Sequence, residues 1–374
     1  AQTWSEHCKH KIFSAKIDNI KLGIFKKFIK GATEKIIKLR KDDFCISLFT
    51  DNAGGIEFSK DWIVCHKVET HNTPSALDPF GGAITGIVGV NRDCLGFGKG
   101  AKPIANTYAY YLAYPNKNYQ LFRQKNKKDP MLSANFIAKG IISGVRVGGN
   151  CSGIPTPQGS LYFDDRFAGK PLVFCGTVGL IPKKIKGKLA HKKKASPGDV
   201  ILMVGGRVGK DGIHGATFSS EELDPNSPVS AVQIGDPITQ KKMSDVIIRE
   251  LRDQNLYSSI TDNGAGGLSS SIGEMAKESG GFIVNLEKVP LKYKGLYPWE
   301  IWVSESQERM TIAVPPLNVK KVIKQFKTRG VEATIIGKFI KKEMAIVKYN
   351  RTKILNLHMD FLHDGYPKLD LKTS

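Results

Sequence analysis

The stretch from residue 63 to residue 93 constrains this chain most, because it joins an apolar segment to a glycine-rich one through a run of ionisable side chains. It reads IVCHKVETHNTPSALDPFGGAITGIVGVNRD. The apolar start predicts a short buried strand. Lys67, Glu69 and His71 alternate along it and should therefore point to one side of an extended backbone. The small and apolar residues 81–89 predict a tightly packed helix. The pattern therefore favours a site at a strand–helix junction.

The residue types in this stretch suit chemistry on a phosphate group held by magnesium. Arg92 and Asp93 place a cation and a carboxylate at the far end of the predicted helix. Mg²⁺ binds one or two carboxylates together with phosphate oxygens, and lysine and arginine hold phosphate. His71 can transfer a proton near neutral pH. An exposed strand end with unrelated charges gives a similar pattern, so this stretch alone leaves both interpretations open.

Composition excludes several classes of protein. The chain has 374 residues, 41% of them hydrophobic, which is enough for two domains with a core each. No run of 18 apolar residues is present, so we expect no membrane span. The pattern of the cysteines leads us to expect a cytoplasmic protein. Six cysteines without a C-x-x-C pair favour reduced thiols over disulfides or a zinc site. The net charge of +21 is spread over many lysines without an aromatic-interleaved basic stripe, so nucleic acid is not indicated.

The rest of the chain shows a boundary and several glycine-rich turns. A lysine-dense segment at residues 183–198 predicts a domain boundary. Residues 148–157 predict a long glycine and proline loop, either purely structural or close to an anion. Asp236 and Pro237 predict the start of a helix. Asp262 ends a predicted strand that faces a glycine-rich helix start, which is an anion-binding arrangement.

Eight motifs, taken in order, resemble the synthetase part of the phosphoribosylformylglycinamidine synthase family, which acts in purine biosynthesis. The resemblance covers nearly all of residues 1–365. The motifs are TWSEHCKHKIF, KVETHNTPSALDPFGGAITG, RDCLGFGKGAKPIA, GGNCSGIPTPQG, GKDGIHGATFSSEEL, VQIGDP, TDNGAGGLSSSIGEMA and SESQERM.

The resemblance implies an α/β (α+β) fold of the aminoimidazole-ribonucleotide-synthetase-like type. Residues 1–181 would form a barrel-forming N-terminal domain that carries the ATP, magnesium and substrate site. Residues 182–348 would form an α/β layered C-terminal domain. Residues 349–374 would be a tail that leads to a missing second half, so we expect part of a longer enzyme or one subunit of a split one.

The resemblance also implies roles for individual residues. His7 and His71 match catalytic histidines, and Lys67 and His10 fall on ATP-contacting positions, although many members have tyrosine where this chain has His10. Thr73 replaces a frequent histidine, and Cys151 replaces a frequent lysine. The implied Mg²⁺ ligands are Glu69, Asp93 and Asp262. The implied substrate-binding residues are Thr70, His71, Asn72, Thr73, Arg92, Gln233, Glu305, Ser306 and Gln307.

The implied reaction is a C–N ligation that uses ATP and Mg²⁺ as cofactors. ATP phosphorylates the amide oxygen of formylglycinamide ribonucleotide, and ammonia then displaces phosphate to give the amidine. Ammonia would come from a glutaminase subunit or domain outside this chain, and a second synthetase half or a homodimer would complete the barrel. No membrane or nucleic-acid partner is expected. Two alternatives remain: a non-catalytic nucleotide-binding or assembly half, and another member of the aminoimidazole ribonucleotide synthetase superfamily.

Overall fold

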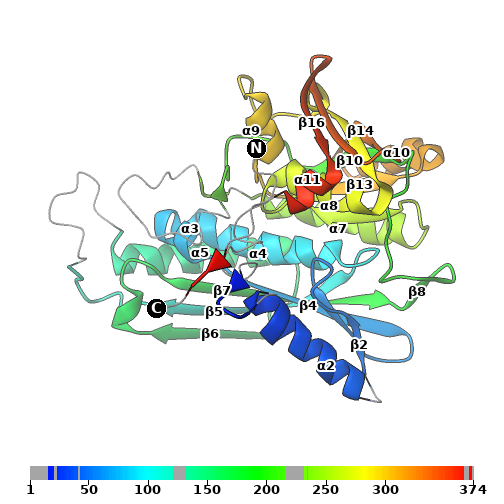
Figure 1. Ribbon diagram of the computed structural model, residues 1–374. Helices are drawn as coiled ribbons and strands as arrows, with labels where there is room; N and C mark the ends of the chain where they lie inside the picture. The colour runs from blue at the N-terminus through cyan, green and yellow to red at the C-terminus, as the bar shows by residue number, and fades with distance from the viewer. Residues whose placement is uncertain are drawn as a thin grey trace.

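A computed structural model describes residues 16–20, 23–40, 43–120, 132–215, 231–233, 235–365 and 370–372. His7 and His10 lie outside the described residues. In the described part, two large mixed sheets each carry their own helices (Figure 1). The α/β fold predicted for the chain is therefore confirmed.

The first sheet has six strands in the order β2-β3-β4-β7-β5-β6. The strands are β2 (Cys45–Ser47), β3 (Gly54–Glu57), β4 (Trp62–Thr70), β5 (Lys102–Leu112), β6 (Gln158–Phe163) and β7 (Leu172–Pro182). Neighbours run antiparallel except β5 and β6, which are parallel. Three helices, α3 (Asn72–Leu77), α4 (Pro79–Gly96) and α5 (Ala134–Ser152), lie on one side of this sheet (Figure 1).

Helix α4 forms where the sequence predicts it. The Asp78 side chain caps it by accepting a hydrogen bond from the Gly81 N–H, and Pro79 occupies the first turn. Ala83 and Ile87 on its inner side pack with Val173 of β7 in a buried cluster. Because 15 of its 18 residues are buried, α4 is a central element rather than a surface helix.

Helix α5 extends into a segment that the sequence predicts to be a loop, so the predicted loop at residues 148–157 is wrong over its first part. The helix runs to Ser152, and Gly153, with φ of +61°, closes it. Glycine is a poor helix former, but here its small size lets α5 approach α4: a Cβ on Gly144 would lie 2.4 Å from the Phe80 carbonyl oxygen. Close packing therefore outweighs local preference.

The second sheet has seven strands in the order β11-β13-β10-β14-β12-β15-β16. They are β10 (Val200–Gly205), β11 (Ser259–Asp262), β12 (Gly281–Asn285), β13 (Arg309–Val314), β14 (Glu332–Ile340), β15 (Met344–Tyr349) and β16 (Thr352–His358). Its helical segments are α7 (Pro237–Asp245), the π-helix η4 (Val246–Arg252), α8 (Gly267–Ser279), α9 (Pro298–Val303), α10 (Val319–Thr328) and α11 (Met359–Asp364). Asp236 caps α7 as predicted.

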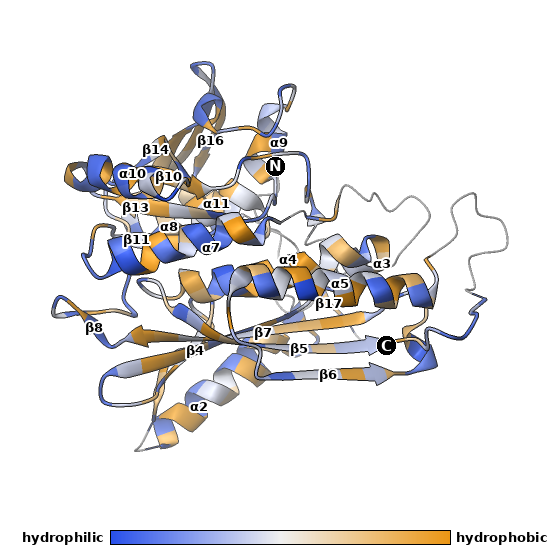
Figure 2. Cartoon of the chain, turned by 180° about the vertical axis from the view of Figure 1, so that it is seen from behind, coloured by the Kyte–Doolittle hydropathy of each residue, from blue (hydrophilic) through white to orange (hydrophobic). Residues whose placement is uncertain are grey.

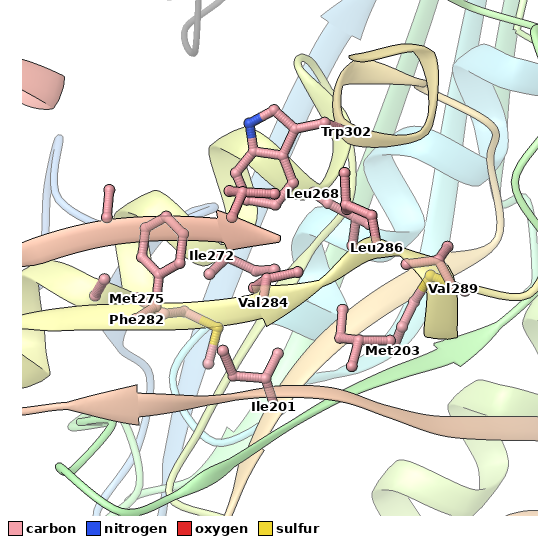
Figure 3. Close-up of a cluster of buried hydrophobic side chains, with 14 of the residues drawn as sticks. Ile201, Met203, Leu268, Ile272, Met275, Phe282, Val284, Leu286, Val289 and Trp302 are labelled. Atoms are coloured by element: carbon pink, nitrogen blue, oxygen red, sulfur yellow. The ribbon is translucent and has the colours of Figure 1, made fainter. Parts of the chain in front are cut away.

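Strand β10 shows why this sheet is covered on both faces. Ile201 and Met203 belong to the cluster that contains residues of α8, α9 and α11 (Figure 3). Leu202 and Val204 belong to a second cluster with residues of α7, η4 and α10. Because successive side chains of a strand point to opposite faces, one continuous apolar strand serves two cores.

The segments at the predicted domain limits contain structure of their own. The lysine-rich boundary holds a short hairpin of β8 (Lys184–Ile185) and β9 (Lys188–Leu189). The predicted tail contains β16 and α11, and β16 pairs with β15 in the second sheet. Near the chain ends, β1 (Lys16–Ile17) pairs with β17 (Asp370–Leu371). The domain limits themselves stay a prediction.

The six-stranded sheet carries exposed apolar side chains away from α4 and α5. Trp62 and Val68 of β4 are exposed there, and so is Tyr162 of β6, which stacks on Tyr111 of β5. The π-helix η1 (Phe25–Lys30) and α2 (Gly31–Leu39) lie on this side, below β4 (Figure 2), but neither contains a buried residue. This face is therefore only partly covered, and closure into a barrel stays a prediction.

Candidate active site

A cleft of about 840 Å³ lies where β4 and α4 of the first unit meet β11 and α8 of the second. Its lining has more acids than bases. The acids are Asp51, Glu69, Asp93, Asp262, Glu274 and Glu278, and the bases are Lys67, Arg92, Lys193 and Lys277. An excess of carboxylates in a partly buried cleft favours a bound cation.

Lys67 lies between two of the predicted magnesium ligands. Its Nζ is 3.2 Å from Glu69 Oε1 and 3.2 Å from Asp93 Oδ2. Lys67 and Glu69 are two residues apart on β4 and point to the side that α4 covers, as predicted. Burial alone would lower the pKa of Lys67, but the Asp93 and Glu69 carboxylates outweigh burial and raise it. Lys67 is therefore a fixed cation.

Asp93 and Asp262 meet across the two units. Asn52 Nδ2 donates hydrogen bonds to Asp93 Oδ1 at 3.2 Å and to Asp262 Oδ1 at 2.9 Å. The Arg92 Nε lies 3.7 Å from Asp262 Oδ2. Burial, reinforced by the other carboxylates, raises the pKa of Asp93 to about 8 although Lys67 opposes the shift. Burial also raises the pKa of Asp262.

These carboxylates fit a cation that brings oxygen ligands of its own. In the part of the chain that the structure describes, no three His, Cys, Asp or Glu side chains stand close enough to hold a metal ion by themselves. Mg²⁺ requires only one or two carboxylates when phosphate oxygens and water complete its shell. Glu69, Asp93 and Asp262 share the cleft as predicted; their metal-binding role stays a prediction.

The predicted residues at the end of β4 line the same cleft. Thr70 and His71 both belong to its lining. Asn72 fixes this corner, because its Oδ1 accepts a hydrogen bond from the Val173 N–H at 3.0 Å. Thr73 is buried in α3 rather than open to the cleft. The strand end is thus held to β7 while His71 stays at the cleft wall.

The remaining predicted substrate residues come from the second unit and form one network. Gln233 Nε2 donates to the Glu305 carboxylate, which also accepts from the Gly266 N–H at 3.0 Å. Gln307 Nε2 donates to the Glu305 carbonyl oxygen, and the Ser306 hydroxyl accepts from the Gly209 N–H. Gln233 and Gln307 line the cleft. Glu305 and Ser306 are buried next to them, and Glu305 accepts the hydrogen bonds that hold both glutamine side chains.

Buried Arg309 holds this second network in place. Its Nε donates to the Ser306 carbonyl oxygen at 2.7 Å, and one of its terminal nitrogens donates to the Ser304 carbonyl oxygen at 2.6 Å. Burial lowers the pKa of Arg309 to about 10, against the opposing charge of Glu308. Two hydrogen bonds from one buried side chain therefore fix the loop at Ser304 and Ser306.

Sequence reasoning missed Asn52, Lys193 and Glu274 in the lining of the cleft. Asn52 belongs to a glycine-rich turn, which by itself predicts only a change of direction. Lys193 is one of three consecutive lysines, and no local signal separates it from its neighbours. Glu274 lies on α8, one turn beyond Ser270, and burial raises the pKa of its carboxyl. Only the folded structure shows that this exposed side of α8 lines the cleft.

Comparison with known proteins decides the family. The family described as AIR synthase related protein matches with its N-terminal domain at residues 50–181 and its C-terminal domain at residues 196–350. The phosphoribosylformylglycinamidine synthase subunit PurL of Thermoplasma volcanium is 35% identical over 365 residues, which is 97% of this chain and 44% of that protein. The chain belongs to the PurL family of AIR synthase related proteins. The resemblance seen in the motifs is thus confirmed.

Solved PurL structures agree with this assignment. The structure titled T. maritima PurL complexed with FGAR has a TM-score of 0.76 and 29% identity, and the match covers 100% of this chain and 53% of that one. T. maritima PurL complexed with ATP has a TM-score of 0.69 and 29% identity, covering 87% and 48% of the two chains. This chain spans about half the length of the PurL proteins that it matches.

Proposed function

We propose that this PurL-like chain contributes the nucleotide and magnesium site of an enzyme that converts formylglycinamide ribonucleotide to formylglycinamidine ribonucleotide. Such an enzyme is a C–N ligase of purine biosynthesis. The observation that carries the proposal is the single cleft that combines Lys67, Arg92 and the carboxylates of Glu69, Asp93 and Asp262. The FGAR and ATP complexes of T. maritima PurL support the same substrate and nucleotide.

The residues of the cleft suit phosphoryl transfer to an amide oxygen. The amide oxygen of the substrate takes the γ-phosphoryl group of ATP, and ADP leaves. Ammonia then adds to the imidate carbon, and phosphate leaves as the amidine forms. Lys67 and Arg92 hold and neutralise phosphate oxygens. Glu69, Asp93 and Asp262 would hold Mg²⁺, which when bound polarises phosphate oxygens.

His71 is proposed to accept the proton that the attacking nitrogen releases. It lies two residues beyond Glu69, at the wall of the same cleft, and general-base catalysis needs such a group within reach of the reacting nitrogen. Gln233 and Gln307 are proposed to contact the substrate from the opposite wall. His7 and His10 lie outside the described residues, and their catalytic and ATP-binding roles remain part of the proposal.

The proposal implies further components. Ammonia would be supplied by a glutaminase subunit or domain outside this chain, and a second synthetase half or a second copy would complete the first domain. We infer a cytoplasmic location from the family's biosynthetic role. Among the described residues, none of the helices is both long and apolar enough to cross a membrane.

A second candidate function is a non-catalytic half that binds nucleotide and assembles with partners. The partly uncovered face of the six-stranded sheet and the coverage of about 44% of the PurL sequence favour it. The two candidates differ in whether this chain's own cleft is used for turnover.

Reconstitution separates the two candidates. The chain is mixed with the remaining part of a PurL protein, ATP, Mg²⁺, substrate and ammonium, and amidine formation is measured. We expect Asp262→Asn to lower the rate by at least 100-fold, because it removes a carboxylate at the phosphate, whereas Asp61→Asn, on an exposed loop, has no effect. Equal rates for both variants would show that the cleft of this chain is not the catalytic one.

A further inference from the structure

One lysine of the run at residues 192–194 is not a surface charge. Lys192 and Lys194 are exposed, whereas the Lys193 side chain is only 13% exposed. Its Nζ donates to four oxygens: Asp51 Oδ1 at 2.5 Å, the Gly96 carbonyl at 2.6 Å, the Ile260 carbonyl at 2.9 Å and Asn52 Oδ1 at 3.3 Å. An ammonium has three hydrogens, so these acceptors saturate it.

These contacts join three separate parts of the fold. Asp51 precedes β3 in the turn after β2, Gly96 is the last residue of α4, and Ile260 lies on β11 of the second sheet. The carbonyl end of a helix favours a cation, which suits the contact with α4. Lys193, from the segment that links the two sheets, therefore binds both walls of the cleft at once.

Asn52 transmits this contact to the carboxylates. Its Oδ1 accepts from Lys193 and from the Thr261 hydroxyl at 3.1 Å, while its Nδ2 donates to Asp93 and Asp262. An amide turned by 180° would present its NH₂ to the ammonium and its oxygen to two carboxylates. Because Lys193 can only donate, it fixes the orientation in which the amide holds both carboxylates.

We propose that Lys193 is a positioning residue for the divalent-cation site: it orients Asn52, whose amide sets the spacing of Asp93 on α4 and Asp262 on β11. This inference rests on the metal role of the two carboxylates in the proposed function. The proposal predicts that Lys193 strengthens metal binding, which is the opposite of what its positive charge alone predicts. A nearby cation repels Mg²⁺, so charge alone predicts tighter metal binding when Lys193 is removed. Positioning predicts weaker binding.

The test is binding of Mn²⁺ to the chain in the presence of ATP, whose phosphate oxygens would complete the metal shell, measured by electron paramagnetic resonance. We expect Lys193→Met to weaken Mn²⁺ binding by about 10-fold or more, which is typical for loss of a group that orients metal ligands. Lys192→Met and Lys194→Met, the adjacent exposed lysines, should bind Mn²⁺ like the unaltered chain. Asn52→Ala should weaken binding by a similar factor, and the double variant should lose no more than either single one, because both act through one amide.

The outcomes separate this inference from the proposed function. If the unaltered chain does not bind Mn²⁺, or Asp262→Asn binds it equally well, the metal assignment itself is wrong. If Asp262→Asn weakens binding but Lys193→Met leaves it unchanged or tighter, Lys193 does not position the site. Should Lys193→Met fail to fold by circular dichroism, Asn52→Ala decides: Mn²⁺ affinity equal to that of the unaltered chain overturns the inference.

Discussion

At the scale of single residues, the cleft shifts the pKa values of a lysine and a carboxylate that lie side by side. Lys67 stays protonated because carboxylates surround it, whereas Asp93 is driven toward its neutral form by burial and by those same neighbours. A bound cation would relieve the repulsion between Asp93 and Asp262. The site therefore favours a bound cation. Without one, the proximity of the buried carboxylates lowers the stability of the folded chain.

We predict that His71→Ala lowers ammonia-dependent turnover of the reconstituted enzyme by ~10²–10⁴-fold, the usual effect of losing a general base. ATP affinity should change little, because Lys67 and the carboxylates remain. His66→Ala is the matched control, since His66 lies on the same strand, exposed on the opposite side. Steady-state kinetics with ammonium checks the prediction, and near-normal turnover of His71→Ala would rule out the role.

Lys99 provides a pH-dependent prediction. Its Nζ donates to the carbonyl oxygens of Tyr257 and Ser258, and burial, together with Lys188, lowers its pKa to about 8. The unfolded chain, with a pKa near 10.5, therefore binds more protons than the folded chain between about pH 8 and 10.5. The contribution of Lys99 to the free energy of unfolding should therefore increase as the pH rises from about 8 to 10.5.

The measurement compares urea unfolding of the unaltered chain, Lys99→Met and the exposed-site control Lys102→Met at several pH values. The stability advantage of the unaltered chain over Lys99→Met should grow between pH 8 and 10.5, while its difference from Lys102→Met shows no such growth. A constant difference for both variants would contradict the lowered pKa of Lys99.

At the scale of elements, α4 and α5 depend on glycine for their close approach. Along α5, Gly140 and Gly144 face α4 with no room for a side chain, since a Cβ would lie within 2.6 Å and 2.4 Å of α4 atoms. Gly149, on the same helix, has its nearest neighbour at 3.6 Å. Position on the helix, not residue type, decides what each glycine does.

We therefore predict opposite effects for two identical substitutions in α5. Gly144→Ala should lower the free energy of unfolding by about 1–3 kcal/mol, because the added methyl group overpacks the contact with Phe80. Gly149→Ala should raise it by up to about 1 kcal/mol through helix propensity. Urea unfolding measures both. Destabilisation by Gly149→Ala would indicate that α5 ends before this residue.

At the scale of the whole molecule, the two sheets differ in how completely they are covered. The seven-stranded sheet has a core on each face, whereas the six-stranded sheet has α4 and α5 on one side and exposed Trp62, Val68 and Tyr162 on the other. Exposed apolar strands promote association. The first sheet is therefore where a partner sheet or a second copy would bind.

We predict that the chain by itself forms a two-fold dimer through this face rather than a stable monomer. The net charge of +21 opposes pairing, but salt at 0.15 M screens surface charges beyond about 8 Å. Sedimentation analysis in that salt checks the prediction. Trp62→Asp should shift the chain toward monomer, whereas Leu317→Asp, at a residue that is 97% exposed outside the sheet, should not. A compact monomer at all accessible concentrations would contradict it.

The sequence by itself determined the local structure and the family. The alternation of Lys67 and Glu69, the cap at Asp236 and the ordered motifs depend on neighbours within a few residues, and the structure places these elements as predicted. The roles of all predicted site residues remain predictions, including those of His7 and His10, which lie outside the described residues. The local pattern also predicted a loop where α5 continues to Ser152. Packing between helices decided where this helix ends, and the local pattern carries no information on packing.

Only the tertiary structure decided which side chains meet across the two sheets. Asn52, Asp93, Lys193 and Asp262 are separated by up to 210 residues along the chain, and no periodicity relates positions so far apart. Lys193 looks identical to Lys192 and Lys194 in the sequence. It differs because folding surrounds one ammonium with carbonyl and carboxyl oxygens and leaves the other two in water.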